Sequence, residues 1–125
     1  MSSTNETFCG ACNQASEEGT NVATAIGSNV AGGTGNTANG EYSAVAGGTR
    51  NVASGSNSGI ASGSNNVASS TYGFVGGGTE NVVAANYATI SGGLSNNARD
   101  MWSTVGGGDT NTVCSKLRSA LTSCM

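Results

Sequence analysis

The chain contains no proline and no histidine, and only 4 basic and 7 acidic residues among its 125. A typical globular domain is about one quarter charged, whereas this chain is 9% charged. Without histidine it lacks the most common general base and the most common metal ligand. Four of the acidic residues, Glu41, Glu80, Asp100 and Asp109, fall at different repeat positions and form no obvious pair for acid–base chemistry. We therefore expect no enzyme activity, no metal site and no cofactor.

Long apolar runs and basic patches are also missing. No apolar run approaches the roughly 20 residues that a membrane-spanning helix needs, so we expect no membrane insertion. A net charge of −3 without a basic patch argues against a nucleic-acid partner. The start of the sequence lacks the basic and apolar stretches of a signal peptide.

The apolar residues that are present are small. Hydrophobic residues make up 36% of the chain, mostly alanine and valine, and there are 21 glycines. Because burial stabilises a fold in proportion to apolar area, this inventory does not build a conventional core of leucine, isoleucine and phenylalanine. Another arrangement must hold the chain together.

A repeat of 15 residues supplies that arrangement. Its first column is β-branched: Val30, Val45, Ile60, Val75, Ile90 and Val105. Glycine follows three places later, at Gly33, Gly48, Gly63, Gly78, Gly93 and Gly108. Asparagine follows six places later, with one member a repeat earlier: Asn21, Asn36, Asn51, Asn66, Asn81, Asn96 and Asn111. Flexible linkers rich in glycine and serine have no fixed repeat period, whereas solenoids do.

Each column has a physical role in a stacked coil. The β-branched residue is expected to open a short strand and to pack inward as the core, and the glycine permits a turn with positive φ. Stacked coils lie about 4.8 Å apart, so the asparagines form a ladder that bonds from coil to coil or satisfies turn backbone groups. We interpret this ladder as structural rather than carbohydrate-binding. The sequence predicts an all-β parallel β-solenoid of about seven coils over residues 15–114.

Two further columns indicate that the solenoid has a partner. Val52, Val67 and Val82 directly precede another small apolar column, which comprises Ala38, Ala53, Ala68, Val83, Ala98 and Val113. Neighbours on a strand face opposite sides, so both sides are apolar, and which column faces inward stays open. An aromatic column is interrupted only by Asn57: Tyr42, Tyr72, Tyr87 and Trp102. We expect the aromatic and valine columns to form an oligomer interface rather than a ligand platform.

Four segments carry a family resemblance: Tyr42–Gly48, Tyr72–Gly78, Tyr87–Gly93 and Trp102–Gly108. They resemble the head repeats of trimeric autotransporter adhesins (YadA-like heads), and similar repeats occur in phage and large-virus fibre proteins. The likeness covers about residues 20–113. It implies a left-handed parallel β-roll, a homotrimer with the aromatic column near the chain interfaces, and attachment to a host surface.

The differences from the adhesins narrow the functional hypothesis. A signal peptide, a coiled-coil stalk and a membrane-anchoring barrel are not visible in the sequence, so we expect a virion or extracellular location rather than a bacterial surface adhesin. We predict a structural trimeric fibre, spike or surface-decorating protein. Its expected partners are its own copies, other assembly proteins, and a host-surface receptor or glycan.

An ice-binding β-solenoid is the alternative function. Such proteins need a flat outward face of regularly repeated small residues, and the best column for it is Thr34, Thr49, Ser64 and Thr79. The column continues as Leu94 and Asp109, which interrupts the array. This interruption argues against ice binding.

The two ends differ from the repeats. Residues 1–14 are expected to form an N-terminal cap or arm. Leu117, Ala120, Leu121 and Cys124 are spaced i, i+3, i+4 and i+7, which predicts a short capping helix over residues 115–125.

The four cysteines lie near these ends. Cys9 and Cys12 form a Cys-Gly-Ala-Cys motif without the βαβ setting of a redox site. About six coils put them roughly 30 Å from Cys114, too far for a disulfide within one chain, and a helix would keep Cys114 from Cys124. Free thiols, a local Cys9–Cys12 bond, and bonds between chains or between successive trimers stay open. Our hypothesis is that some cysteines crosslink chains.

Overall fold

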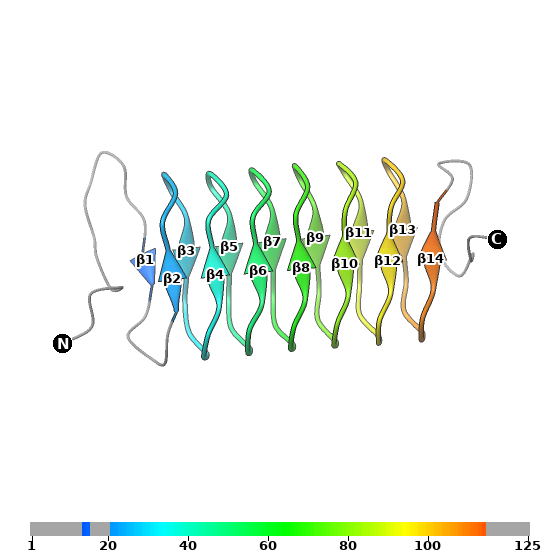
Figure 1. Cartoon of the computed structure of the whole chain (residues 1–125), viewed down its shortest axis with the longest axis horizontal. Helices are drawn as coiled ribbons and strands as arrows, with labels where there is room; N and C mark the ends of the chain where they lie inside the picture. Colours follow the sequence, from blue (N-terminus) through cyan, green and yellow to red (C-terminus); the bar gives the residue numbers. More distant parts are fainter. Residues whose placement is uncertain (1–13, 16–20, 115–125) are drawn as a thin grey trace.

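The computed structural model describes residues 14–15 and 21–114. Within them the chain is an all-β solenoid in which two seven-stranded parallel sheets face each other along one long axis (Figure 1). This confirms the predicted parallel β-solenoid. The described residues form about six turns rather than about seven. The expected caps, with Cys9, Cys12 and Cys124, lie outside the described residues, apart from Gln14.

The strands are two residues long and alternate between the sheets. The odd sheet contains β1 (Gln14–Ala15), β3 (Asn29–Val30), β5 (Ala44–Val45), β7 (Gly59–Ile60), β9 (Phe74–Val75), β11 (Thr89–Ile90) and β13 (Thr104–Val105). The even sheet contains β2 (Val22–Ala23), β4 (Thr37–Ala38), β6 (Val52–Ala53), β8 (Val67–Ala68), β10 (Val82–Val83), β12 (Asn97–Ala98) and β14 (Thr112–Val113).

Every strand pairs with residues 15 positions away, so the sequence period is the structural period. Val45 lies beside Ile60 in the odd sheet, and Val52 lies beside Val67 in the even sheet. The backbone N–H of Val52 donates to the carbonyl of Asn66 at 2.8 Å, and that of Ala46 donates to Ile60 at 3.0 Å. A continuous backbone ladder therefore joins successive coils.

The core is one column of side chains from each sheet. The odd sheet contributes the β-branched residues Val30, Val45, Ile60, Val75, Ile90 and Val105, and the even sheet contributes Ala38, Ala53, Ala68, Val83, Ala98 and Val113. Each is at most 2% exposed. The valine and isoleucine side chains of the odd sheet face mainly alanine, and together they fill the interior of a thin coil.

The structure resolves one open point and corrects another. The alanine-rich column faces inward, whereas Val52, Val67 and Val82 lie on the outer side and are half-buried. The β-branched core residue was expected to open its strand, but it is the second and last residue of each two-residue strand. The residue before it points outward, as strand alternation requires.

Glycines close the turn from each odd strand to the next even strand, which we call the glycine corner (residues 47–51 and their equivalents). The column from Gly33 to Gly108 has φ between 85° and 102°, a region that L side chains rarely adopt. A Cβ on Gly48 would lie 2.2 Å from the carbonyl oxygen of Gly63 in the next coil. The two stacked turns thus lie closer together than a residue with a Cβ atom would allow.

The asparagine column satisfies the backbone of this corner. The side-chain Nδ2 of Asn66 donates to the carbonyls of Ser62 at 3.2 Å and Gly78 at 2.9 Å, while its Oδ1 accepts the N–H of Asn81 at 2.9 Å. The same pattern recurs along the column, and from Asn21 to Asn96 its members are at most 1% exposed. One amide-to-amide bond joins side chains of the column, from Nδ2 of Asn51 to Oδ1 of Asn36 at 3.2 Å. The ladder therefore joins coils chiefly through side-chain-to-backbone bonds.

Candidate interaction surface

The aromatic column lies in the turns from each even strand to the next odd strand, which we call the aromatic corner (residues 39–43 and their equivalents). Its backbone is left-handed, with φ between 57° and 67° at Tyr42, Tyr72, Tyr87 and Trp102. The N–H of Tyr72 donates to the carbonyl of Ser56 at 3.0 Å, so hydrogen bonding between coils fixes this conformation. Asn57 and Gly27 occupy the same position with the same sign of φ, and they are the residue types that tolerate it best.

Left-handed backbone by itself does not distinguish this corner. The glycine corner has a second positive-φ column, which holds Gly35, Arg50, Asn65, Glu80, Ser95 and Thr110. Each non-glycine residue there costs about 1–2 kcal/mol. The same backbone requirement is met by small and polar residues at one corner and mainly by aromatic residues at the other. The choice of aromatic side chains therefore needs a separate explanation.

The aromatic rings stack on one another along the solenoid axis. The ring centroids of Tyr72 and Tyr87 are 5.1 Å apart, those of Tyr87 and Trp102 are 4.2 Å apart, and both pairs are within 10° of parallel. Tyr42 lies over Gly27, where an added Cβ would be 2.5 Å from the ring atom Cδ1. A sugar-binding platform presents an open ring face, but the faces of Tyr87 are covered by its two neighbours. This geometry favours contact with protein through the ring edges.

Exposed apolar surface gathers at the same corner. Eight large hydrophobic side chains of the described residues are exposed, and six of them belong to this corner: Ile26, Tyr42, Tyr72, Tyr87, Met101 and Trp102. Trp102 is 63% exposed and Tyr42 is 61% exposed. Clustered apolar surface of this kind marks interaction sites, whereas scattered exposed residues do not.

Two outward surfaces, one on each sheet, also carry no charged residue. We define the odd face by two outward columns: Asn29, Ala44, Gly59, Phe74, Thr89 and Thr104, with Ala31, Ala46, Ala61, Gly76, Ser91 and Gly106. We define the even ridge by one outward column: Val22, Thr37, Val52, Val67, Val82, Asn97 and Thr112. These two surfaces flank the aromatic corner on either side.

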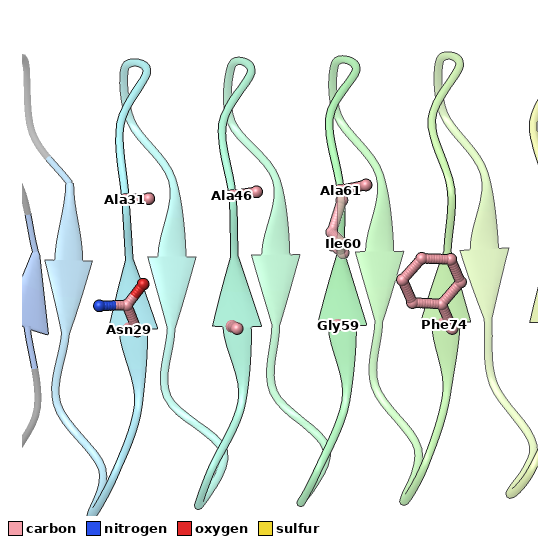
Figure 2. A pocket seen from close by; sticks show the side chains of 8 residues that line it. Asn29, Ala31, Ala46, Gly59, Ile60, Ala61 and Phe74 are labelled. Atoms are coloured by element: carbon pink, nitrogen blue, oxygen red, sulfur yellow. The ribbon is translucent and has the colours of Figure 1, made fainter.

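The odd face carries a shallow hollow of about 300 Å³. Small residues line it on three successive coils, and Phe74 stands on β9 at one end, where it is 41% exposed (Figure 2). The Phe74 ring leans toward the preceding coil. Its Cδ1 atom lies 3.4 Å from the position that a Cβ on Gly59 would occupy. Small residues and no charge make this hollow a place for an apolar side chain rather than a polar ligand.

The other residues singled out from the sequence are dispersed. The Thr34 column forms parallel bridges in register up to Asp109, at the glycine corner. Glu41, Glu80, Asp100 and Asp109 lie at different positions of the 15-residue repeat. Cys114, the last described residue, is disulfide-bonded within the chain, and its partner lies outside the described residues. The expectation that Cys114 has no disulfide partner within one chain is therefore wrong.

In residues 14–15 and 21–114, no three or more His, Cys, Asp or Glu side chains lie together as metal ligands. The same residues contain no helix that is long and apolar enough to span a membrane.

Comparison of the chain with protein-family models, with curated proteins and with solved structures finds no match. The surface chemistry of the solenoid is therefore the basis for a functional proposal. Sequence reasoning did not single out Phe74 or the hollow beside it. The column of Phe74 holds five different residue types at its six positions from Asn29 to Thr104, so the period gives no signal there.

Proposed function

We propose that this protein is a structural, trimeric β-solenoid that forms a fibre, spike or surface-decorating element of a virion or another extracellular assembly. The trimer is proposed as a left-handed β-roll with the aromatic corner at its chain interfaces. Its partners are its own copies, neighbouring assembly proteins and a host-surface receptor or glycan. The observation that carries the proposal is the exposed, stacked aromatic column.

The energetics of this column favour burial by a partner chain. The left-handed backbone destabilises the chain by about 1–2 kcal/mol at each aromatic residue. Each stacked pair stabilises it by only about 0.5–1.5 kcal/mol. Four such positions and two stacked pairs are present. Asparagine meets the backbone requirement without an exposed ring, as Asn57 does in the same column. Large aromatic side chains are the residues that contribute most when they are buried at an interface.

A rigid, uniform rod also suits a structural role. Side-chain and backbone hydrogen bonds run from coil to coil throughout residues 21–114, so stability accumulates through nearest-neighbour contacts. Ice binding receives less support, because Leu94 and Asp109 continue the threonine column.

The aromatic column is tested by replacing Tyr72, Tyr87 and Trp102 with asparagine in one variant. The single chain is expected to keep its β-solenoid, since asparagine tolerates the left-handed region. The trimer is expected to weaken by about 100-fold or more, from about 1 kcal/mol for each lost anchor. Molar mass from light scattering across a concentration series measures the change, and circular dichroism checks the fold.

A matched control carries three asparagines in the threonine column, at Thr49, Ser64 and Thr79. This control is expected to remain trimeric. If the aromatic variant is as trimeric as the control, the aromatic column is not the chain interface, and the proposal loses its main support.

A further inference from the structure

The odd face and the even ridge change character in step along the axis. On the odd face, Asn29 is followed by the apolar positions Ala44, Gly59 and Phe74, and then by Thr89 and Thr104. On the even ridge, Thr37 is followed by Val52, Val67 and Val82, and then by Asn97 and Thr112. Fifteen residues rise by about 4.8 Å, so positions half a coil apart differ in height by only about 2 Å. From Asn29 onward, each polar position in this column of the odd face is therefore level with a polar position of the even ridge. Each apolar position is likewise level with an apolar one.

Charges avoid both surfaces. No member of the odd face or of the even ridge is charged. Arg50, Glu80 and Asp109 lie at the glycine corner, and Glu41, Arg99 and Asp100 lie at the aromatic corner. Covering the members of the two surfaces therefore buries no charge of their own, which removes the largest cost of such a contact. Arg99 is exposed beside Asn97 and lies at the border of the even ridge.

We propose that the odd face of one chain packs in register against the even ridge of a second copy, with the neighbour's Val52 and Val67 in the hollow beside Phe74. This inference rests on the proposed trimer and names the surfaces that build it. A cyclic trimer needs two different, complementary surfaces on each chain. Rotation about an axis parallel to the solenoid keeps every residue at its own height. The hollow spans the heights from Asn29 to Phe74 (Figure 2), and Val52 and Val67 lie between these two levels.

The shapes of the two surfaces also match. The ridge presents β-branched side chains that are half-buried in the single chain, while the hollow is lined by alanine and glycine apart from Asn29, Ile60 and Phe74. Both surfaces border the aromatic corner, because each aromatic turn joins an even strand to the next odd strand. One arrangement therefore brings the aromatic corner, the valine ridge and the hollow to a common interface.

Single charged substitutions test the two surfaces separately. Val67→Lys alters the ridge and Ala61→Glu alters the exposed rim of the hollow. Each is expected to convert the trimer to a monomer at concentrations where the unchanged chain is fully trimeric. Asn65→Lys is the control, because Arg50 already occupies the same exposed, left-handed column, and it is expected to remain trimeric.

The double variant Val67→Lys with Ala61→Glu tests the register. The two positions are on opposite sides of one chain but level across the proposed interface, so the trimer is expected to return with strong salt dependence. Val67→Lys with Thr104→Glu is the matched control. Thr104 lies on the same face about three coils away, and this pair is expected to remain monomeric.

The outcomes separate this inference from the proposed function. A trimeric unchanged chain whose Val67→Lys and Ala61→Glu variants also remain trimeric would overturn the inference and leave the trimer standing. If only Ala61→Glu matters, the odd faces pack on each other and the inference is wrong. Should Val67→Lys fail to fold, a trimeric Ala61→Glu variant still refutes the inference. A monomeric unchanged chain refutes the proposed function itself.

Discussion

Asn66→Ala is expected to destabilise the solenoid by about 3 kcal/mol or more. The substitution removes the partners of the Ser62 and Gly78 carbonyls and of the Asn81 N–H. Asn66 and Asn81 are fully buried, so water does not readily replace these bonds. A buried polar group without a partner costs about 1–3 kcal/mol, and a typical domain is stable by only about 5–15 kcal/mol. Urea unfolding followed by circular dichroism at one protein concentration measures the loss.

Two further variants show whether the hydrogen bonds are the cause. Asn39→Ala removes the same side chain from an exposed position and is expected to change stability by less than about 0.5 kcal/mol. Asn66→Asp keeps the shape but replaces the donor Nδ2 with an oxygen that faces two carbonyls, and it is expected to be as damaging as Asn66→Ala. Equal stabilities for Asn66→Ala and Asn39→Ala would show that the ladder contributes little.

Gly48→Ala is expected to cost about 2–5 kcal/mol, from overpacking at about 1–3 kcal/mol and a strained backbone at about 1–2 kcal/mol. Gly48 has φ of 96°. Its new methyl group would lie 2.2 Å from the carbonyl oxygen of Gly63 and 2.6 Å from Nδ2 of Asn51. One coil must move away from the next, which also disturbs the asparagine ladder. Thermal unfolding and hydrogen exchange of the flanking coils measure the effect.

Gly47 provides an adjacent control for this substitution. A Cβ on Gly47 has no other atom within 4 Å, and its φ is not in the left-handed region. Gly47→Ala is therefore expected to leave stability unchanged or to raise it by up to about 1 kcal/mol, because alanine restricts the unfolded chain. If the two alanine variants are equally stable, the turns are not packed as closely as described.

The 15-residue phase was sufficient to predict the solenoid, because stacking places equivalent residues beside one another whatever their neighbours are. The pairing of Val45 with Ile60 follows directly from it. The phase did not show which of Val52 and Ala53 faces inward, since both are apolar and alternation then carries no information. In the structure the smaller residue faces inward, because the thin coil already holds a valine or isoleucine from the odd sheet.

Sequence reasoning placed the aromatic column on the surface but did not predict its backbone conformation. Tyrosine and tryptophan favour strands, whereas Tyr72 and Trp102 have positive φ in this structure. Coil-to-coil hydrogen bonding imposes that conformation on every member of the column. Gly27 and Asn57 in the same column are the signal that would have revealed it, since both residue types tolerate left-handed backbone.

The most direct test of the account is the molar mass of the unchanged chain in solution, measured by size-exclusion chromatography with light scattering, with and without reductant. The account predicts the mass of three chains in both conditions, since the proposed contacts are non-covalent. A mass of one chain in both conditions would contradict it, because the aromatic corner, the odd face and the even ridge would then be exposed to water.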